Sequence, residues 1–337
     1  MPRQKASIVA GTAAGSSAAA GAPPSRKGTV ARSMSIAPLA LAVLAQVGGI
    51  GKGGGTGGAP PVGTQAVKCA TGIADFQACH DRYATGCSQG GKYDGYLNSL
   101  KNQLIDPASE PQHSFKVDDL LALEKELPPG LTKANHEEFE DAMRALGEGE
   151  VAALNGYLYY AKDGGSESTN CLLSGPDDID FHIGIGGDPS LVAKAAHHQL
   201  TPMDRKQAVI VEMTPHWRAE YAPSWSVAQL QKAVGRQVYV VGQLLADNEH
   251  DNPGDDCAHV DATSHADATG HCWRPTIWEL HPVTRFWVCA RAQCAPDGAG
   301  PGWTSLESFA SAPQVAAVPP QPAPPGGAGG VGTAPGK

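Results

Sequence analysis

The chain has 337 residues, with 34 acidic and 25 basic side chains and 8 cysteines, and its length allows two domains at most. Every acidic residue lies within 68–307, so the central body is strongly acidic, which argues against non-specific binding to nucleic acid or to an anionic membrane. No apolar run approaches the ~20 residues that span a bilayer, which argues against an integral membrane protein.

Residues 1–64 form a signal-like segment followed by Gly/Ala-rich low-complexity sequence. An apolar run at 36–45 follows three basic side chains and ends on small residues that permit cleavage after Ala45, the layout of a secretory signal peptide. This pattern predicts a periplasmic or secreted protein. An alanine-rich disordered leader is the alternative interpretation.

The cysteines support export. All eight lie within the acidic body and none forms a C-x-x-C pair, which is typical of structural disulfides in an oxidising compartment. Eight cysteines allow 105 pairings, so the connectivity stays open. The pair most readily expected is Cys257 with Cys272, because it would close a long loop.

Residues 65–147 are predicted to be a small helical, cysteine-containing region. Leucines recur at helical spacing from Asp118 to Leu127, where Pro128 ends the pattern. Asn135 followed by Glu138 resembles a capping box that opens a further helix.

From 148 to 295 the hydrophobic period changes to two, which predicts strands. Five are expected, at 151–160, 178–185, 208–214, 237–246 and 276–289. Asp188-Pro189 should begin a short helix after the second strand. Ser226 and Gln229 form a capping box for a helix between the third and fourth strands.

This order of elements resembles the OB-fold, a five-stranded Greek-key barrel with a helix between strands three and four. The resemblance implies a mostly β domain with some helix. The phrases Trp278-Glu279-Leu280-His281-Pro282 and Gly242-Gln243-Leu244-Leu245 are also similar to ones in uncharacterised exported bacterial proteins. Residues 296–337 are predicted to be a Pro/Gly-rich disordered tail.

Polar side chains recur on the expected strands. Asp180 and His182 share a face of the second strand with Asp178, Glu212 lies on the third, and Glu279 and His281 share a face of the fifth. In an OB arrangement these strands are neighbours, so the side chains could converge as a ligand site, a divalent-metal site or an acid–base pair. The alternatives are the solvent face of a half-exposed sheet and a set of internal ion pairs.

The segment between the fourth and fifth strands is the densest in histidine and aspartate. His250, His259, His265 and His271 could bind zinc or calcium there, although their spacing matches no standard zinc pattern. A solvated loop closed by a disulfide is the alternative. Trp273, at the end of this loop, is a candidate platform for stacking a base or a sugar.

These patterns favour an exported, disulfide-stabilised, OB-like protein that binds an oligosaccharide, a nucleotide or a protein partner. The alternative is a metal-dependent hydrolase or phosphodiesterase built on the strand acids and histidines. OB-folds of the staphylococcal-nuclease type combine such acids with two arginines, and no arginine here has a recognisable spacing to them. The catalytic residues therefore stay unassigned.

Overall fold

A computed structural model describes residues 69, 72–87, 92–252, 254–259 and 272–313. The signal-like run, the glycine-rich stretch, His265, His271 and the tail beyond 313 lie outside these residues. The strands are β1 His113–Lys116, β2 Val151–Asp163, β3 Phe181–Gly186, β4 Ala208–Met213, β5 Gln237–Ala246, β6 Trp278–Cys289 and β7 Trp303–Ser305. The α-helices are α1 Phe76–Arg82, α2 Lys92–Lys101, α3 Val117–Leu123, α4 Glu140–Ala145, α5 Val192–Ala196, α6 Pro202–Arg205, α7 Pro215–Tyr221, α8 Val227–Lys232 and α9 Leu306–Ser311.

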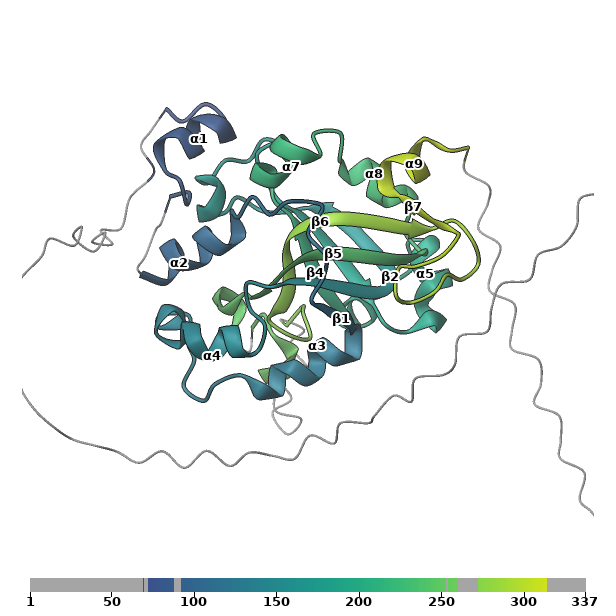
Figure 1. The fold of residues 1–337 in the computed structure, drawn as a ribbon, viewed down its shortest axis with the longest axis horizontal. Coiled ribbons are helices and arrows are strands. Elements are labelled where there is room, and N and C mark those ends of the chain that lie inside the picture. Colours follow the sequence, from purple (N-terminus) through teal and green to yellow (C-terminus); the bar gives the residue numbers. More distant parts are fainter. Residues whose placement is uncertain (1–68, 70–71, 88–91, 253, 260–271, 314–337) are drawn as a thin grey trace, which may run out of the picture. The chain divides into compact units, whose positions relative to one another are not determined.

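Five strands close a ring of pairings in the order β2–β3–β4–β6–β5 and back to β2. All of these pairings are antiparallel except β4 with β6. The predicted strands all occur, and β5 has the predicted bounds. In Figure 1 the ring strands run side by side, with α7, α8 and α9 along one side and α3 and α4 along the other.

Alternation along the strands builds the core inside the ring. Ile183, Val211 and Leu280 point inward from three neighbouring strands and are fully buried. Their chain neighbours point outward, and this outer side carries the polar residues of the candidate site. Many of those residues are buried as well, because other segments cover this part of the ring.

Two of the three expected helix caps are present. Asn135 begins a 3₁₀ turn, His136–Phe139, but the predicted capping box is wrong, because the Asn135 side chain makes no cap and accepts a hydrogen bond from the Thr132 amide instead. The Asp188 side chain accepts a hydrogen bond from the Ser190 amide at the start of a 3₁₀ turn that leads into α5. Ser226 and Gln229 form the reciprocal capping box that begins α8, between β4 and β5. These local signals position the helices around the ring.

The region before the ring is helical, as predicted, but it also supplies a strand. β1 pairs in parallel with β2, from His113 opposite Ala152 to Lys116 opposite Asn155. The helix predicted at 118–127 occurs as α3 and a 3₁₀ turn, Glu124–Glu126. With its many helices the chain has a mixed sheet-and-helix architecture rather than a mostly β one.

Two further expectations need correction. The second strand begins at Phe181, so Asp178 and Asp180 both lie before it, and the Asp178 carboxylate accepts a hydrogen bond from the Phe76 amide. The predicted disordered tail contains β7, which pairs with β6, and α9, which buries Leu306 and Phe309. Helix α7 was not predicted, although Pro215 in its first turn is a helix-start signal.

Every cysteine lies at disulfide distance from another. The pairs are Cys69–Cys87, Cys79–Cys171, Cys257–Cys272 and Cys289–Cys294. The predicted pairing of Cys257 with Cys272 is confirmed. Among the described residues, no helix is both long and apolar enough to cross a membrane.

Candidate functional site

The polar residues that alternate with the core converge on the outer side of β3, β4 and β6. His182 and Glu212 are directly opposite each other in the β3–β4 ladder. Val211 pairs with Leu280 in the adjacent β4–β6 contact, which places Glu212 beside Glu279 and His281. The predicted convergence of these strands is therefore confirmed.

Segments far away in the sequence cover this face. Lys101 comes from the end of α2, Glu167 and Asp180 come from the loop between β2 and β3, and Asp247 and Arg274 flank the loop between β5 and β6. As a result the side chains of Asp180, Glu212, Glu279 and His281 are at most 2% exposed. The predicted solvent-facing alternative is therefore wrong for these four residues.

The innermost group consists of Asp180, Glu212 and His281. Their ligand atoms lie within 4.8 Å of one another. Asp180 Oδ1, Glu212 Oε2 and His281 Nε2 are each buried without a hydrogen-bond partner. Buried polar atoms are nearly always hydrogen-bonded, so three such atoms in one cluster call for a water molecule or an ion as their partner.

A relay of side chains sets the orientation of the His281 ring. Arg274 Nη2 donates a 2.6 Å bond to Glu279 Oε2, and the other Glu279 oxygen lies 3.1 Å from His281 Nδ1. Although burial opposes ionisation, the Arg274 guanidinium holds the pKa of Glu279 below its usual range. An ionised Glu279 is a hydrogen-bond acceptor for Nδ1–H, and in that tautomer of His281 the ring lone pair is on Nε2. Metal-binding histidines are commonly oriented by a carboxylate in this way.

A second group shares Glu212 and lies closer to solvent. His182 Nε2 is 3.2 Å from Glu212 Oε1 and 3.3 Å from Glu167 Oε1. The side chains of Glu167 and His182 are 24% and 12% exposed. Glu212 thus faces the inner group with one oxygen and the outer group with the other.

Lys101 neutralises part of the cluster. Its Nζ lies 2.8 Å from Asp247 Oδ2 and 3.8 Å from carboxylate oxygens of Glu167 and Glu249. Burial would lower the pKa of Lys101, but these carboxylates raise it well above its usual range. Burial likewise opposes ionisation of Glu167, yet the Lys101 ammonium lowers the pKa of Glu167 to about 2. Lys101 is therefore a permanent cation paired with acids that stay ionised.

The remaining acids have no comparable partner. Burial raises the pKa of Glu212 well above its usual range, and neighbouring carboxylates add to this effect. Burial and then the Glu167 carboxylate raise the pKa of Asp180. The carboxylates of the cluster are those of Glu167, Asp180, Glu212, Asp247, Glu249 and Glu279, and its permanent cations are Lys101 and Arg274. The carboxylates thus outnumber the permanent cations, and the ionised forms of Asp180 and Glu212 are the ones disfavoured.

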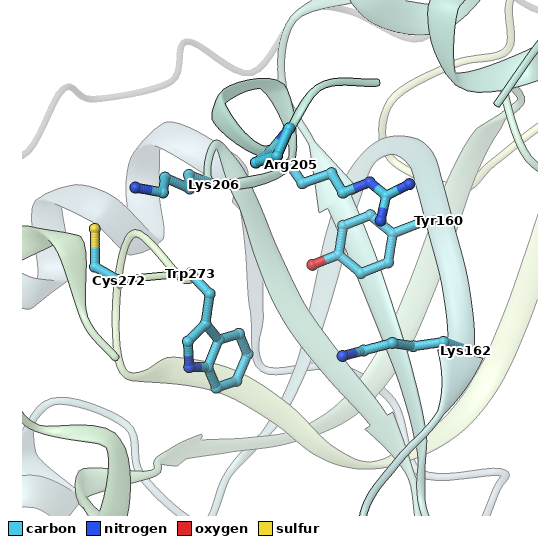
Figure 2. Close-up of a pocket in the computed structure, with 7 residues that line it drawn as sticks. Tyr160, Lys162, Arg205, Lys206, Cys272 and Trp273 are labelled. Atoms are coloured by element: carbon cyan, nitrogen blue, oxygen red, sulfur yellow. The ribbon is translucent and has the colours of Figure 1, made fainter. Parts of the chain in front are cut away.

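Trp273 lies next to the outer group. Its ring is nearly parallel to that of His182, with 11° between the planes and 6.4 Å between the centroids. Its Nε1 donates a 2.9 Å hydrogen bond to Asp255 Oδ1, which fixes the indole. Figure 2 shows Trp273 at one side of a pocket whose other lining residues include Tyr160, Lys162 and Arg205.

In the part of the chain that the structure describes, the histidines of the predicted loop metal site do not lie together. His250 Nδ1 is 3.3 Å from Asp255 Oδ2, and its ring meets Trp273 edge-on. His259 lies in a short 3₁₀ helix, Cys257–His259, while His265 and His271 are outside the described residues. A metal site in this loop stays a prediction.

Sequence reasoning did not identify Lys101 or Glu167 as members of the site. Lys101 ends α2, where Leu97 and Leu100 recur at helical spacing but no pattern marks the lysine. Glu167 lies in an irregular loop. No spacing links either residue to the strand positions. No family model, curated protein or solved structure matches the chain.

Proposed function

We propose that this chain binds a divalent cation at Asp180, Glu212 and His281, with Glu167 and His182 as further ligands, and that it is a metal-dependent hydrolase. The observation that supports this most directly is the set of three buried, unpartnered atoms, Asp180 Oδ1, Glu212 Oε2 and His281 Nε2. Two carboxylate oxygens and one imidazole nitrogen are a common combination of metal ligands in proteins.

A cation would also balance the charge of the cluster. An unpaired carboxylate is costly to bury unless it is protonated, paired or bound to a metal. Lys101 and Arg274 already pair with Asp247 and Glu279, so they leave Asp180 and Glu212 uncompensated. A divalent ion between these two carboxylates would supply the missing positive charge.

The mixture of nitrogen and oxygen ligands favours zinc or manganese over calcium. Calcium in proteins takes oxygen ligands almost throughout, whereas imidazole suits zinc and the heavier divalent metals. His182 and His281 both face the carboxylates, so a site that uses them should prefer zinc.

The exposed side of the cluster supports a catalytic role. Glu167 and His182 are partly accessible, so solvent could reach this side of the cluster, where Glu167, His182 and Glu212 would hold the metal. In hydrolysis of a phosphate ester, the water oxygen would form the new bond to phosphorus, the P–O bond to the leaving group would break, and the proton of the water would end on the leaving oxygen. A bound divalent metal lowers the pKa of such a water and stabilises the developing charge.

The proposed fold assignment is OB-like. The ring order and the position of α8 between β4 and β5 support it. OB-folds bind ligands on the outer face of their second and third strands and on the adjoining loops, and the cluster occupies the corresponding face of β3 and β4.

We also infer that the protein is exported to the periplasm or secreted. Four cysteine pairs at disulfide distance support an oxidising environment, and the apolar run at 36–45 supports a signal peptide.

A binding protein without turnover is the second candidate. The complete burial of Asp180 and His281 favours it, because a metal held only by the inner group would have little contact with solvent. Such a protein would retain a ligand, a partner or the cation itself without chemistry.

Calorimetry of the full chain with zinc, manganese and calcium tests the metal site. Zinc or manganese should bind at one site per chain, and Glu212→Gln should weaken binding at least a hundredfold. Glu220→Gln makes the same chemical change on the exposed side of α7 and should leave the affinity unchanged. Absence of binding by all three metals, or unaltered binding in Glu212→Gln, would refute the proposed site.

Turnover separates the two candidates. The zinc- or manganese-loaded chain should cleave bis(p-nitrophenyl) phosphate, and a chelator should stop the reaction. Metal binding without any cleavage, of this diester or of p-nitrophenyl phosphate, would favour the binding protein.

A further inference from the structure

A pocket of about 210 Å³ lies beside the outer group of the cluster and has a different chemical character. Its lining residues are Tyr160, Lys162, Pro202, Arg205, Lys206, Cys272 and Trp273. In Figure 2 the Tyr160 hydroxyl and the Lys162 ammonium point toward the Trp273 indole, and Arg205 lies over the Tyr160 ring. Aromatic and cationic side chains thus share one small concave surface.

The charge of this pocket is opposite to that of the body around it. Three cationic side chains line the pocket and, among the described residues that line it, none is acidic. Lys162 and Arg205 are exposed and form no ion pair within the part of the chain that the structure describes. Arg205 packs 5.7 Å from the Tyr160 ring centroid, which positions its guanidinium without neutralising it.

The aromatic walls are held in place. Trp273 is fixed through its bond to Asp255 and by the neighbouring Cys257–Cys272 disulfide. The Tyr160 ring lies across Gly184, where an added Cβ would be 2.4 Å from the ring. Burial raises the pKa of Tyr160 to about 12, so its hydroxyl stays protonated and can donate a hydrogen bond.

The pocket adjoins the proposed metal site. Lys162 is directly opposite His182 in the β2–β3 ladder, and Trp273 stacks on that histidine. His182 in turn contacts Glu212. A ligand in the pocket would therefore lie one side chain away from the outer ligands of the metal.

We propose that this pocket binds a small phosphorylated aromatic compound of the nucleotide class, with its phosphate between Lys162 and Arg205 and its ring against Trp273. The proposal rests on the proposed function and names its substrate class, because a phosphate beside Lys162 lies next to His182, the cross-strand partner of Lys162 and a proposed metal ligand. Arginine and lysine are the common protein partners of phosphate, and indole faces stack on bases of any sequence. A small pocket suits a mononucleotide or a chain end better than the body of a polymer.

Binding of adenosine 5′-monophosphate to the full chain in the presence of a chelator tests the pocket without the metal. We expect that Lys162→Gln and Arg205→Gln each weaken binding about tenfold, since each removes one charge-assisted contact. Lys133→Gln removes an exposed lysine that does not line the pocket and should leave the affinity unchanged. Added salt should weaken binding to the unaltered chain more than to Lys162→Gln.

The aromatic half is tested with adenosine and inorganic phosphate. Trp273→Leu should weaken the binding of adenosine 5′-monophosphate and of adenosine but not that of inorganic phosphate. Failure of the unaltered chain to bind adenosine 5′-monophosphate, or equal affinity in all the variants, would overturn the proposal.

Glu212→Gln distinguishes this proposal from the proposed function. In chelator this variant should bind adenosine 5′-monophosphate like the unaltered chain, because Glu212 does not line the pocket. If metal binding is absent while nucleotide binding and its dependence on Lys162 persist, the metal site fails and the pocket stands. If the chain binds metal but does not bind adenosine 5′-monophosphate, the pocket is refuted and the metal site stands.

Discussion

His182 on β3 and Glu212 on β4 are direct cross-strand partners, and His182 Nε2 lies 3.2 Å from Glu212 Oε1. The other Glu212 oxygen faces His281, at 3.5 Å from its Nδ1. One carboxylate on a central strand therefore links a half-buried imidazole to a fully buried one. Glu212 is the residue whose removal should have the most specific consequences.

Without metal, Glu212 should destabilise the fold. It is 2% exposed, and its raised pKa indicates that burial disfavours its ionised form. Glu212→Gln keeps the shape and removes the charge, so the free energy of unfolding in chelator should rise by ~1–2 kcal/mol. Urea denaturation near neutral pH measures this. If Glu212→Gln were less stable than the unaltered chain in chelator, the charge of Glu212 would already be compensated by neighbouring side chains.

Glu279 should respond in the opposite direction, although it is equally buried. It is bonded to both Arg274 and His281, and Glu279→Gln would leave the buried guanidinium unpaired. The expected loss is ~3–5 kcal/mol in urea denaturation. Glu140→Gln, which breaks the exposed Glu140–Arg144 pair on α4, is the matched control and should change stability by less than ~0.5 kcal/mol. Equal effects of the two substitutions would contradict the ion-pair argument.

The strands could be predicted wherever the hydrophobic pattern extended over many residues. β5 is a mostly apolar run of ten residues, and the predicted bounds agree with it to the residue. β1 and β7 have only four and three residues, too few to establish a period of two, and they form because β2 and β6 offer free edges. Short strands of this kind depend on their partners, which the local sequence does not encode.

The same contrast holds for the site. Period two was sufficient to place His182, Glu212 and His281 on one side of the ring. Lys101 and Glu167 belong to the site through tertiary contacts with partners far away in the sequence, such as Asp247, 146 residues from Lys101. The sequence therefore predicts which side of the sheet carries the polar residues, but not the segments that pack over that side. Those segments turn a polar sheet surface into a buried cluster.

Acid should loosen the contact between α1 and α7. The rings of His80 and His216 are stacked with 3.9 Å between their centroids. Burial, and then the His216 charge, lower the pKa of His80 from 6.5 to about 4. In the unfolded chain His80 thus takes up a proton near pH 6.5, whereas in the folded chain the His80 ring stays neutral until about pH 4. Stability is therefore fully present above pH 6.5 and falls as the pH drops from 6.5 toward 4.

Urea midpoints measured between pH 7.5 and pH 4.5 test this dependence. His80→Gln removes the titrating ring, so the difference in stability between the unaltered chain and the variant should shrink or reverse as the pH falls. Carboxylates that titrate in the same range act on both proteins and cancel in that difference. A difference that does not vary with pH would show that His80 is protonated equally in both states.

The four disulfides should contribute unequally, because the chain segments that they close differ in length. Cys79–Cys171 spans 92 residues and Cys289–Cys294 spans only 5. All four sulfurs are buried, at 8% exposure or less, so replacement of either pair by alanine removes similar packing. Loop entropy then predicts a loss of ~4–5 kcal/mol for the long pair and ~2 kcal/mol for the short one.

Urea denaturation of the two double-alanine variants measures these losses. The long pair joins α1 to the loop that carries Glu167, and that loop covers the cluster of Asp180, Glu212 and His281. Cys79→Ala with Cys171→Ala should therefore also weaken zinc binding, whereas the short-pair variant should not. Equal losses of stability would show that native packing outweighs chain entropy. Unaltered zinc affinity in the long-pair variant would show that the loop keeps its position over the cluster by its side-chain contacts alone.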